Sequence, residues 1–512
     1  MAAQKSPRTG SRLVLLSSLV LALVLLWGAC RGQTSPHPNI VFILADDMRY
    51  DDLKYMPKTL ALLRSQGMSF KQAFVSNAHC CPSRATIMRG QYAHNTGVLI
   101  SSNRSDGGWE AYKANGWETD NVATRLSNAG YRTGLFGKYL NGYSGTSVPP
   151  GWVDWFAMDS VEYFDYDVND NGTIKHYGSD KSDYSTDVLS TQTQQFIRES
   201  ITQRKPFFAY VAPKAPHGPA TPAPRDLHSY DGEKAPRPPS FNEDDVSDKP
   251  PWISSLPPLS PYQVSQIDAR QENRAESLQA MDDLVERMVN SLIGAGVLDN
   301  TYIFFTSDNG WESGEHRIRS KKWQPYEESI HMPLLVRGPG VAAGSTTNAL
   351  VLNTDFLPTF ADLAGIKRPG YVDGRSLRPV LKGRATTWRT AILLERRDFE
   401  NPDTEHNGIR TSNGRKYLEY EGGFRELYDL NTDPYELSNN YNAATPPTNL
   451  VARLQALKEC AGDSCRAAEN GQWFRREASG PRRDGRQRNP QSSSVSRRIL
   501  AHLFTQQRRA RL

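Results

Sequence analysis

Apolar and polar segments alternate in a strand–helix order between about residue 38 and about residue 365. Residues 39–45 (NIVFILA) are a continuous apolar run that ends in two acids, which is typical of a strand buried on both faces of a parallel sheet. Apolar residues recur on one face of residues 265–293, which predicts a long helix. Further strands are predicted at 69–76, 131–139, 205–212, 301–310 and 332–340, and further helices at 56–67, 119–130 and 354–365.

This alternation predicts an α/β fold in which a large, mostly parallel sheet is sandwiched by helices. We place this main domain at residues 36–385. The pattern then changes to short strand-like pieces, which predict a small α+β subdomain with an antiparallel sheet at residues 386–470. Its predicted strands are 390–395, 407–420 and 425–430, and its predicted helix is 447–461.

Prolines concentrate in one segment, since thirteen of the 33 lie between Pro213 and Pro261. The segment directly follows a predicted strand and is too rich in proline to belong to the core. Two interpretations are open: an ordered surface excursion that shapes a substrate cleft, and a disordered insert.

The N-terminus predicts export. Lys5, Arg8 and Arg12 precede an apolar run at 13–27 and then small residues, which is the pattern of a signal peptide, here residues 1–33. We therefore expect a secreted or extracytoplasmic protein with no stable membrane span after cleavage. An uncleaved membrane anchor or lipidation at Cys30 is the alternative.

Charge is unevenly distributed along the chain. The net charge is +5, but residues 475–512 alone carry +9, which leaves −4 on the preceding residues. Because the main domain is not basic, nucleic acid is not expected as a partner. The Arg-rich tail is predicted to be disordered, and it would either attract a polyanionic glycan or serve only as a solvated end.

Export changes what the five cysteines predict. Cys460 and Cys465 are spaced to close a small loop, and an oxidising compartment favours a disulfide between them. Cys80 and Cys81 are sequence neighbours and therefore poor candidates for pairing with each other.

Oxygen-rich side chains follow two of the predicted strands. Asp46 and Asp47 end the first, and Asp308 and Asn309 end a later one. Ligands in open α/β sheets bind at such strand ends, and carboxylate and amide oxygens suit Ca²⁺ or Mg²⁺ better than zinc. Either pair alone could be a turn or a helix cap, but two pairs in one sheet favour a metal site.

Several cationic side chains are further candidates. Arg84 and Lys138 follow predicted strands, Lys322 lies in KKWQPYEE, and His217 in APHGP lies at another strand end. Isolated Lys and Arg usually belong to solvated surface, and a lone His is more often structural. Together they would suit a tetrahedral dianion, with the His as a proton donor near neutral pH.

The segment CCPSRATIMRG at 80–90 resembles the signature of the sulfatase family, Cys-x-Pro-Ser-Arg followed by a Gly. Other segments resemble sulfatase landmarks in the same order, so that the resemblance runs from about Pro38 to Leu437. These segments are PNIVFILADD, GLFGKYL, APHGP, FTSDNG, a Lys four residues before Tyr-Glu, and ELYDLNTDPYE.

The resemblance implies that a formylglycine-generating enzyme converts Cys80 to formylglycine, whose hydrated aldehyde is the nucleophile, while Cys81 occupies the variable second position. Ca²⁺, or alternatively Mg²⁺, would contact residue 80 and be held by the four strand-end residues. These are Asp46, Asp47, Asp308 and Asn309.

The resemblance also implies roles for the cations. Arg84 would orient the hydrated aldehyde, Lys138 and Lys322 would bind sulfate oxygens, and His217 would face the ester oxygen. Lys322 is preferred to Lys321 because it lies four residues before Tyr326 of the Tyr-Glu pair.

One motif departs from the family pattern. Many sulfatases have Lys-Trp-His where this chain has Lys138-Tyr139-Leu140, so that His is absent. His94 is a further candidate for a polar contribution to the site, and a role in supporting its loop is the favoured interpretation. The sequons at Asn103 and Asn171 are glycosylation sites only in a eukaryotic host.

The run Val148–Trp152 (VPPGW) and the preceding KYLN resemble the sulfatases that act on 6-O-sulfated glucosamine, including extracellular heparan-sulfate enzymes. The expected substrate is therefore a sulfate ester on a sulfated glycan, with an aryl sulfate as the alternative. The alternative functions are a phosphomonoester or phosphodiester hydrolase of the same superfamily, and an inactive relative that binds sulfated glycans.

Overall fold

The computed structural model describes residues 1–2, 37–385 and 387–471. Most of the predicted signal peptide and all of the predicted basic tail lie outside these residues. Among the described residues, no helix combines the length and apolar character needed to cross a membrane. The proposed domain boundaries stay predictions.

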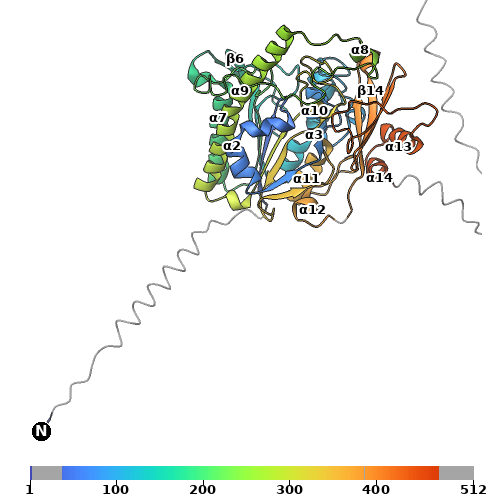
Figure 1. Cartoon of the computed structure of the whole chain (residues 1–512). Coiled ribbons are helices and arrows are strands. Elements are labelled where there is room, and N and C mark those ends of the chain that lie inside the picture. The colour runs from blue at the N-terminus through green and yellow to red at the C-terminus, as the bar shows by residue number, and fades with distance from the viewer. Residues whose placement is uncertain (3–36, 386, 472–512) are drawn as a thin grey trace, which may run out of the picture. The chain divides into compact units, whose positions relative to one another are not determined.

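A ten-stranded sheet forms the centre of the protein (Figure 1), and the pairs that include β10 or β6 are antiparallel while its other pairs are parallel. This confirms the predicted fold class. In spatial order the strands are β11 (Ser345–Thr347), β2 (Met68–Phe70), β10 (Leu334–Arg337), β9 (Thr301–Ser307), β1 (Asn39–Ala45), β8 (Phe207–Ala212), β4 (Arg132–Gly137), β5 (Asp154–Met158), β6 (Tyr166–Asp170) and β7 (Thr173–Tyr177).

Strand β1 is apolar throughout because helices cover both faces of the sheet. Ile40, Phe42 and Leu44 pack in one core and the residues between them in the other, as the two-residue repeat of a strand requires. The first core includes α3 (Cys80–Arg89), α5 (Gly108–Ala114), α6 (Val122–Asn128), α11 (Phe356–Leu363) and α12 (Arg378–Leu381), and the second includes α7 (Ser185–Thr202) and α9 (Pro261–Gly294).

The long helix α9 begins where its sequence provides a cap. The Ser260 hydroxyl accepts a hydrogen bond from the Gln263 backbone N–H, and the Gln263 side chain accepts one from the Ser260 N–H. Pro261 stands at the first helical position, where no N–H is needed.

Shorter elements are α2 (Pro57–Thr59), α4 (Ala93–Thr96), α8 (Pro251–Ser254), α10 (Glu327–Ile330), η1 (Tyr50–Tyr55), η2 (Leu60–Arg64), η3 (Trp117–Thr119), η4 (Lys181–Asp183), η5 (Leu298–Asn300), η6 (Asn353–Asp355) and η7 (Pro402–Thr404), with β3 (Ala73–Phe74) pairing to β12 (Val351–Leu352).

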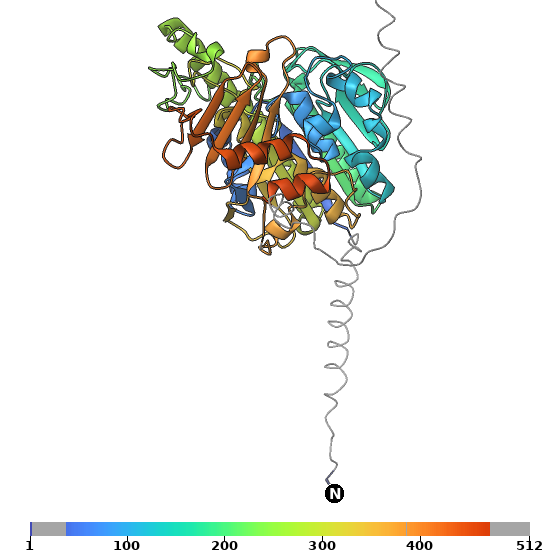
Figure 2. The same ribbon diagram turned by 90° about the vertical axis from the view of Figure 1, so that its right-hand side faces the viewer.

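The C-terminal elements form a four-stranded antiparallel sheet with two helices beside it (Figure 2). The Cys460–Cys465 disulfide joins the segment after α13 to α14, as expected from the spacing. The elements are β13 (Ala391–Arg396), β14 (His406–Thr411), β15 (Arg415–Tyr420), β16 (Arg425–Asp429), α13 (Thr448–Lys458) and α14 (Asp463–Glu469).

A fully buried arginine joins this sheet to the main domain. Arg389 bonds both carboxylate oxygens of Asp355, with Nη1 2.7 Å from Oδ2, and its Nε lies 3.0 Å from Glu469 Oε2. All three side chains have 0% exposure. Asp355 therefore depends on this guanidinium for its neutralisation, whereas Glu469 also pairs with Arg375, whose Nη2 lies 2.6 Å from Glu469 Oε2.

His94 is a second link between the main domain and the C-terminal segments, and it does not belong to the group of residues around Cys80. Its Nδ1 lies 2.9 Å from Glu395 Oε2, and its Nε2 lies 3.0 Å from the Cys460 carbonyl oxygen. Burial alone would lower the pKa of His94, but the Glu395 carboxylate outweighs it and raises the pKa to about 9.

This pKa predicts a pH dependence of stability. Because the folded pKa lies above the ordinary value of 6.5, the stabilisation is complete below pH 6.5 and is lost as the pH rises through 9. We expect the free energy of unfolding, measured by denaturant titration, to fall by about 1–2 kcal/mol between these pH values through this residue. The variant His94→Gln should remove that part of the fall, whereas His176→Gln, at an exposed histidine beside two carboxylates, should not. An unchanged profile in His94→Gln would contradict this account.

Candidate functional site

The topology of the sheet brings the predicted strand-end residues to one edge. Strand β1 lies between β9 and β8, and β4 lies beside β8, all parallel, so their carboxyl ends meet. The side chains that follow these strands are Asp46 and Asp47 after β1, Asp308 and Asn309 after β9, Lys138 after β4, and His217 in the segment after β8.

The two acidic pairs contact each other through the β1–β9 register, in which Ala45 is opposite Ser307. Asp47 has a positive φ of 65°, and its backbone N–H donates to Asp308 Oδ1 at 3.2 Å. Asn309 Nδ2 donates to Asp47 Oδ1 at 2.6 Å. The strand ends therefore fix three buried side chains against one another.

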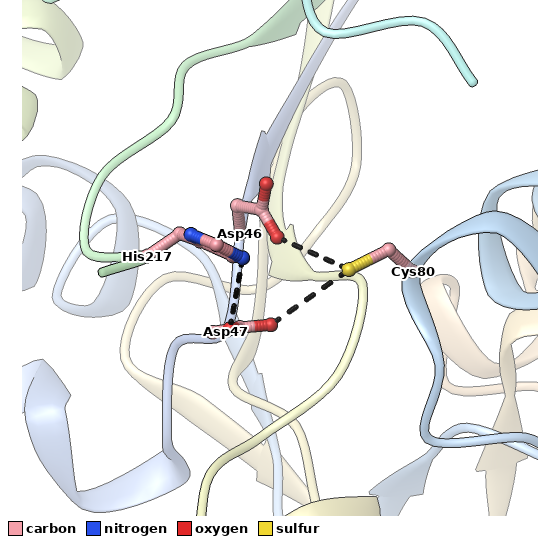
Figure 3. Close-up of side chains that lie close together, drawn as sticks. All are labelled: Asp46, Asp47, Cys80 and His217. Carbon is pink, nitrogen blue, oxygen red and sulfur yellow. Dashed lines mark hydrogen bonds and ion pairs between the residues drawn. The ribbon is translucent and has the colours of Figure 1, made fainter. Parts of the chain in front are cut away.

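Cys80 faces this edge from the first residue of α3. Its Sγ lies 3.5 Å from Asp46 Oδ1 and 4.0 Å from Asp47 Oδ1, as Figure 3 shows. His217 approaches the same group from the opposite side, with Nε2 3.6 Å from Asp47 Oδ2. One ligand atom from each of these four residues lies within 4.8 Å of the others.

Two lysines complete the surroundings of Cys80. Lys138 Nζ lies 2.5 Å from Asp46 Oδ2, while Lys322 Nζ lies 2.7 Å from Cys80 Sγ and also contacts Asp47 Oδ1. Both lysines are buried. Lys321, its sequence neighbour, is exposed, so the structure places Lys322 and not Lys321 in the cluster.

Arg84 lies one turn further along α3, with no exposed surface. Its Nε donates to Asp308 Oδ2 at 2.7 Å, its Nη1 donates to the Lys138 carbonyl at 3.0 Å, and its Nη2 lies 3.7 Å from Asp46 Oδ2. One guanidinium thus holds the helix, β4 and both strand ends together. Asp308 turns toward Arg84, so it lies outside the four-residue group around Cys80.

Burial decides the chemistry of the unmodified thiol. It raises the pKa of Cys80 to about 12, with Asp46 and Asp308 acting in the same direction and Lys138 and Lys322 against it. Asp46 behaves differently, because Lys138 and the other cations outweigh burial and hold its pKa well below the ordinary value. A thiol with so high a pKa is un-ionised at neutral pH and is a poor nucleophile.

The oxygen atoms of the cluster fit a divalent cation. Asp47 Oδ2 and Asn309 Oδ1 are buried and accept no hydrogen bond in the described part of the chain. Together with Asp46 they present hard oxygen ligands, which Ca²⁺ and Mg²⁺ prefer. Orphaned buried acceptors are costly unless a ligand satisfies them.

A cavity of about 180 Å³ opens above these side chains. Asp46, Lys138 and His217 line it, together with Asn141 and Lys214, which sequence reasoning missed. Lys214 lies three residues before His217, so its place in APKAPHGP was the available signal. Leu140, which stands where many sulfatases have a His, also lines the cavity.

Comparison with known proteins agrees with this geometry. Residues 38–366 match the family model described as Sulfatase. The chain belongs to the sulfatase family. Residues 314–460 also match a second model of this group, N-sulphoglucosamine sulphohydrolase, C-terminal. As a sulfatase, the protein is a sulfuric ester hydrolase.

Two relatives illustrate the likeness in sequence. Human N-acetylglucosamine-6-sulfatase is 34% identical over 515 residues, which cover 90% of this chain and 92% of that protein. The extracellular sulfatase SULF-1 homolog of Drosophila melanogaster is 39% identical over 370 residues, covering 70% of this chain. The matched part is only 33% of that fly protein.

Solved structures show the same fold. One, a complex with its substrate D-glucosamine-2-N,6-O-disulfate, has a TM-score of 0.70 at 24% identity and covers 85% of this chain and 99% of its own. A phosphonate monoester hydrolase of Agrobacterium radiobacter has a TM-score of 0.66 at 22% identity, covering 84% and 96%. The fold is therefore shared with an enzyme of phosphorus chemistry.

Proposed function

We propose that this sulfatase hydrolyses 6-O-sulfate esters of glucosamine in a sulfated glycan, with formylglycine formed from Cys80 as its nucleophile and Ca²⁺ as its metal. The observation that carries the proposal is the position of residue 80. Its Sγ is surrounded by Asp46, Asp47 and Lys322, and Asp46 also lines the cavity of about 180 Å³ together with Lys138 and His217.

The lysines supply the sulfate-binding charge. Lys138 and Lys322 enter from different loops and are buried, so their ammonium groups act on a bound sulfuryl group with little screening by water. Formylglycine at position 80 would supply a hydrated aldehyde. One of its hydroxyls would attack sulfur as the S–O bond to the sugar breaks and the alcohol leaves, and the second hydroxyl would then expel inorganic sulfate by losing its proton as the aldehyde C=O re-forms. The cation, held by the strand-end oxygens, would offset negative charge on the sulfuryl oxygens.

His217 is placed to deliver a proton to the leaving oxygen. Its Nδ1 donates to the Gly218 carbonyl at 2.9 Å, which fixes the orientation of the ring. Its Nε2 then faces the cavity beside Asp47. Arg84 acts one layer below, where it holds Asp308 and Asp46 and so positions the residues around formylglycine.

The relatives support the proposed substrate and place of action. N-acetylglucosamine-6-sulfatase is similar over nearly the whole chain, and the glucosamine-6-O-sulfate complex shares the fold. With the signal-peptide pattern, this supports an exported enzyme that acts on glycans and that meets a formylglycine-generating enzyme during maturation.

A paired assay tests the proposal. The purified protein, with residue 80 modified, is expected to hydrolyse glucosamine 6-sulfate about 100-fold or more faster than a matched phosphate monoester, because a sulfate monoester carries one negative charge and a phosphate monoester carries two, and one cation site with two lysines supplies less positive charge than a two-metal phosphatase site. Chelation should abolish turnover, and Ca²⁺ should restore it better than Mg²⁺. A faster phosphate ester would indicate a phosphatase, and glycan binding without turnover would indicate an inactive relative.

A further inference from the structure

A second cavity, of about 670 Å³, lies next to the active site along the chain. Part of its wall is Gly218 and Pro219, which directly follow His217, and another part is Lys321, which directly precedes Lys322. His217 lines the first cavity and consecutive Cα atoms are about 3.8 Å apart, so the linings of the two cavities adjoin at His217 and Gly218. We call it the outer cavity.

The outer cavity is lined by cations without acids. Arg270, Arg317, Arg319 and Lys321 line it, and no carboxylate does. Within the described ranges, none of the four lies within 4.0 Å of a carboxylate oxygen, whereas most other arginines of the main domain have such a partner. Four like charges around one hollow repel one another unless an anion occupies it.

One of these cations is held in place by neutral groups. The Arg317 guanidinium donates to the backbone carbonyls of Glu243, Asp244 and Leu256 at 2.8, 2.6 and 2.9 Å. These bonds tie the loop after β9 to the Pro-rich segment without cancelling the charge. That segment is therefore an ordered wall of a cleft, the first of the two interpretations of its prolines.

The other cations leave their charge available to a ligand. Arg270, on α9, bonds the Ser320 hydroxyl and lies 5.9 Å from the centre of the Trp311 ring, which also lines the cavity. Arg319 and Lys321 are exposed. An aromatic ring beside exposed cationic groups offers a sugar both an apolar surface and a partner for its anionic groups.

We propose that the outer cavity is an anion subsite, which binds a sulfate or carboxylate group on a sugar next to the one whose ester occupies the Cys80 site. The inference rests on the proposed function, because it takes a sulfated glycan as the substrate. Arg270, Arg319 and Lys321 would bind the neighbouring sugar of the substrate, and they would take no part in the chemistry at residue 80.

Kinetics with substrates of two sizes test the subsite. In the full chain, the double variant Arg319→Ser with Lys321→Ser is expected to raise KM for a sulfated heparan tetrasaccharide about tenfold, because it removes two exposed charge-assisted contacts. The kcat for this substrate should not change. The kinetics of a small aryl sulfate should not change. The matched control, Arg198→Ser with Lys205→Ser, removes two exposed cations outside the cavity and should leave both substrates unaffected. Unchanged tetrasaccharide kinetics, or equal losses with both substrates, would overturn the proposal.

A binding measurement separates this proposal from the function on which it rests. By calorimetry, a tetrasaccharide without 6-O-sulfate should bind the wild-type protein, and the Arg319/Lys321 double variant should bind it about tenfold more weakly. Carboxyl-reduced and N-desulfated tetrasaccharides identify which anionic group is bound. Charge-dependent binding in a protein that hydrolyses no sulfate ester would support the subsite and refute the proposed function, whereas no binding by the wild type would refute the subsite.

Discussion

Replacing Cys80 by Ser is expected to lower kcat for a sulfate ester by about 10⁴-fold or more while the protein stays folded. The reason is chemical, since a serine hydroxyl can accept a sulfuryl group but has no second hydroxyl on the same carbon to release it. Mass spectrometry of the wild-type peptide that contains residue 80 should find formylglycine there. Full turnover by Cys80→Ser, or an intact thiol throughout an active preparation, would refute the assignment.

Cys81 provides the matched control. It is the adjacent residue of α3 and is fully buried. Its side chain packs in the core that also includes α5, α6 and α11, and not against the acidic pairs. Cys81→Ser should therefore cost stability, about 1–3 kcal/mol for a buried hydroxyl, and leave kcat near the wild-type value. Loss of turnover in both variants alike would indicate general disruption of the helix and not chemistry at residue 80.

Replacing Arg389 by Met is expected to give the largest loss of stability, about 3–5 kcal/mol in the free energy of unfolding. Asp355 would then be a buried carboxylate without a cation, and Glu469 would keep only Arg375, at the junction of the main domain and the C-terminal sheet. Thermal or denaturant unfolding measures the loss. The folded fraction should keep its kcat, because Arg389 touches none of the residues around Cys80.

Arg378→Met is the control for this experiment. Arg378 also pairs with an aspartate, Asp362, but the two side chains are 51% and 37% exposed. Water solvates these charges, so loss of the Arg378–Asp362 ion pair should lower the free energy of unfolding by less than about 1 kcal/mol. Equal effects of the two substitutions would show that burial of the Arg389 network does not determine its contribution.

The sequence predicted those elements whose periodicity is uninterrupted. Strands β1, β8 and β9 are continuous apolar runs, and the apolar face of α9 is long. Helix α7 was missed because Ser and Thr occupy many of its buried positions; Thr193 and Ser200 satisfy their hydroxyls on carbonyls four residues earlier, at 2.8 and 2.7 Å. The predicted strand at 69–76 divides into β2 and β3, which join different sheets.

The candidate site was predictable to different degrees. Asp46 and Asp308 follow parallel strands, so topology alone brings them to one edge. Lys322 reaches Cys80 through an irregular loop, whose path no periodicity encodes, so the sequence made it a candidate cation and the family resemblance alone gave it a place in the site. The outer cavity could not be predicted, because its charges come from α9 and a loop that backbone carbonyls of the Pro-rich segment hold in place.

The burial of Cys80 also has a consequence for the timing of maturation. Its side chain is 3% exposed at the start of a helix packed between the sheet and α11. On the proposed function, a modifying enzyme must hold this segment in an extended form, before α3 has packed. Activation would then be limited to the interval between synthesis and folding, so that a molecule that folds first remains permanently inactive.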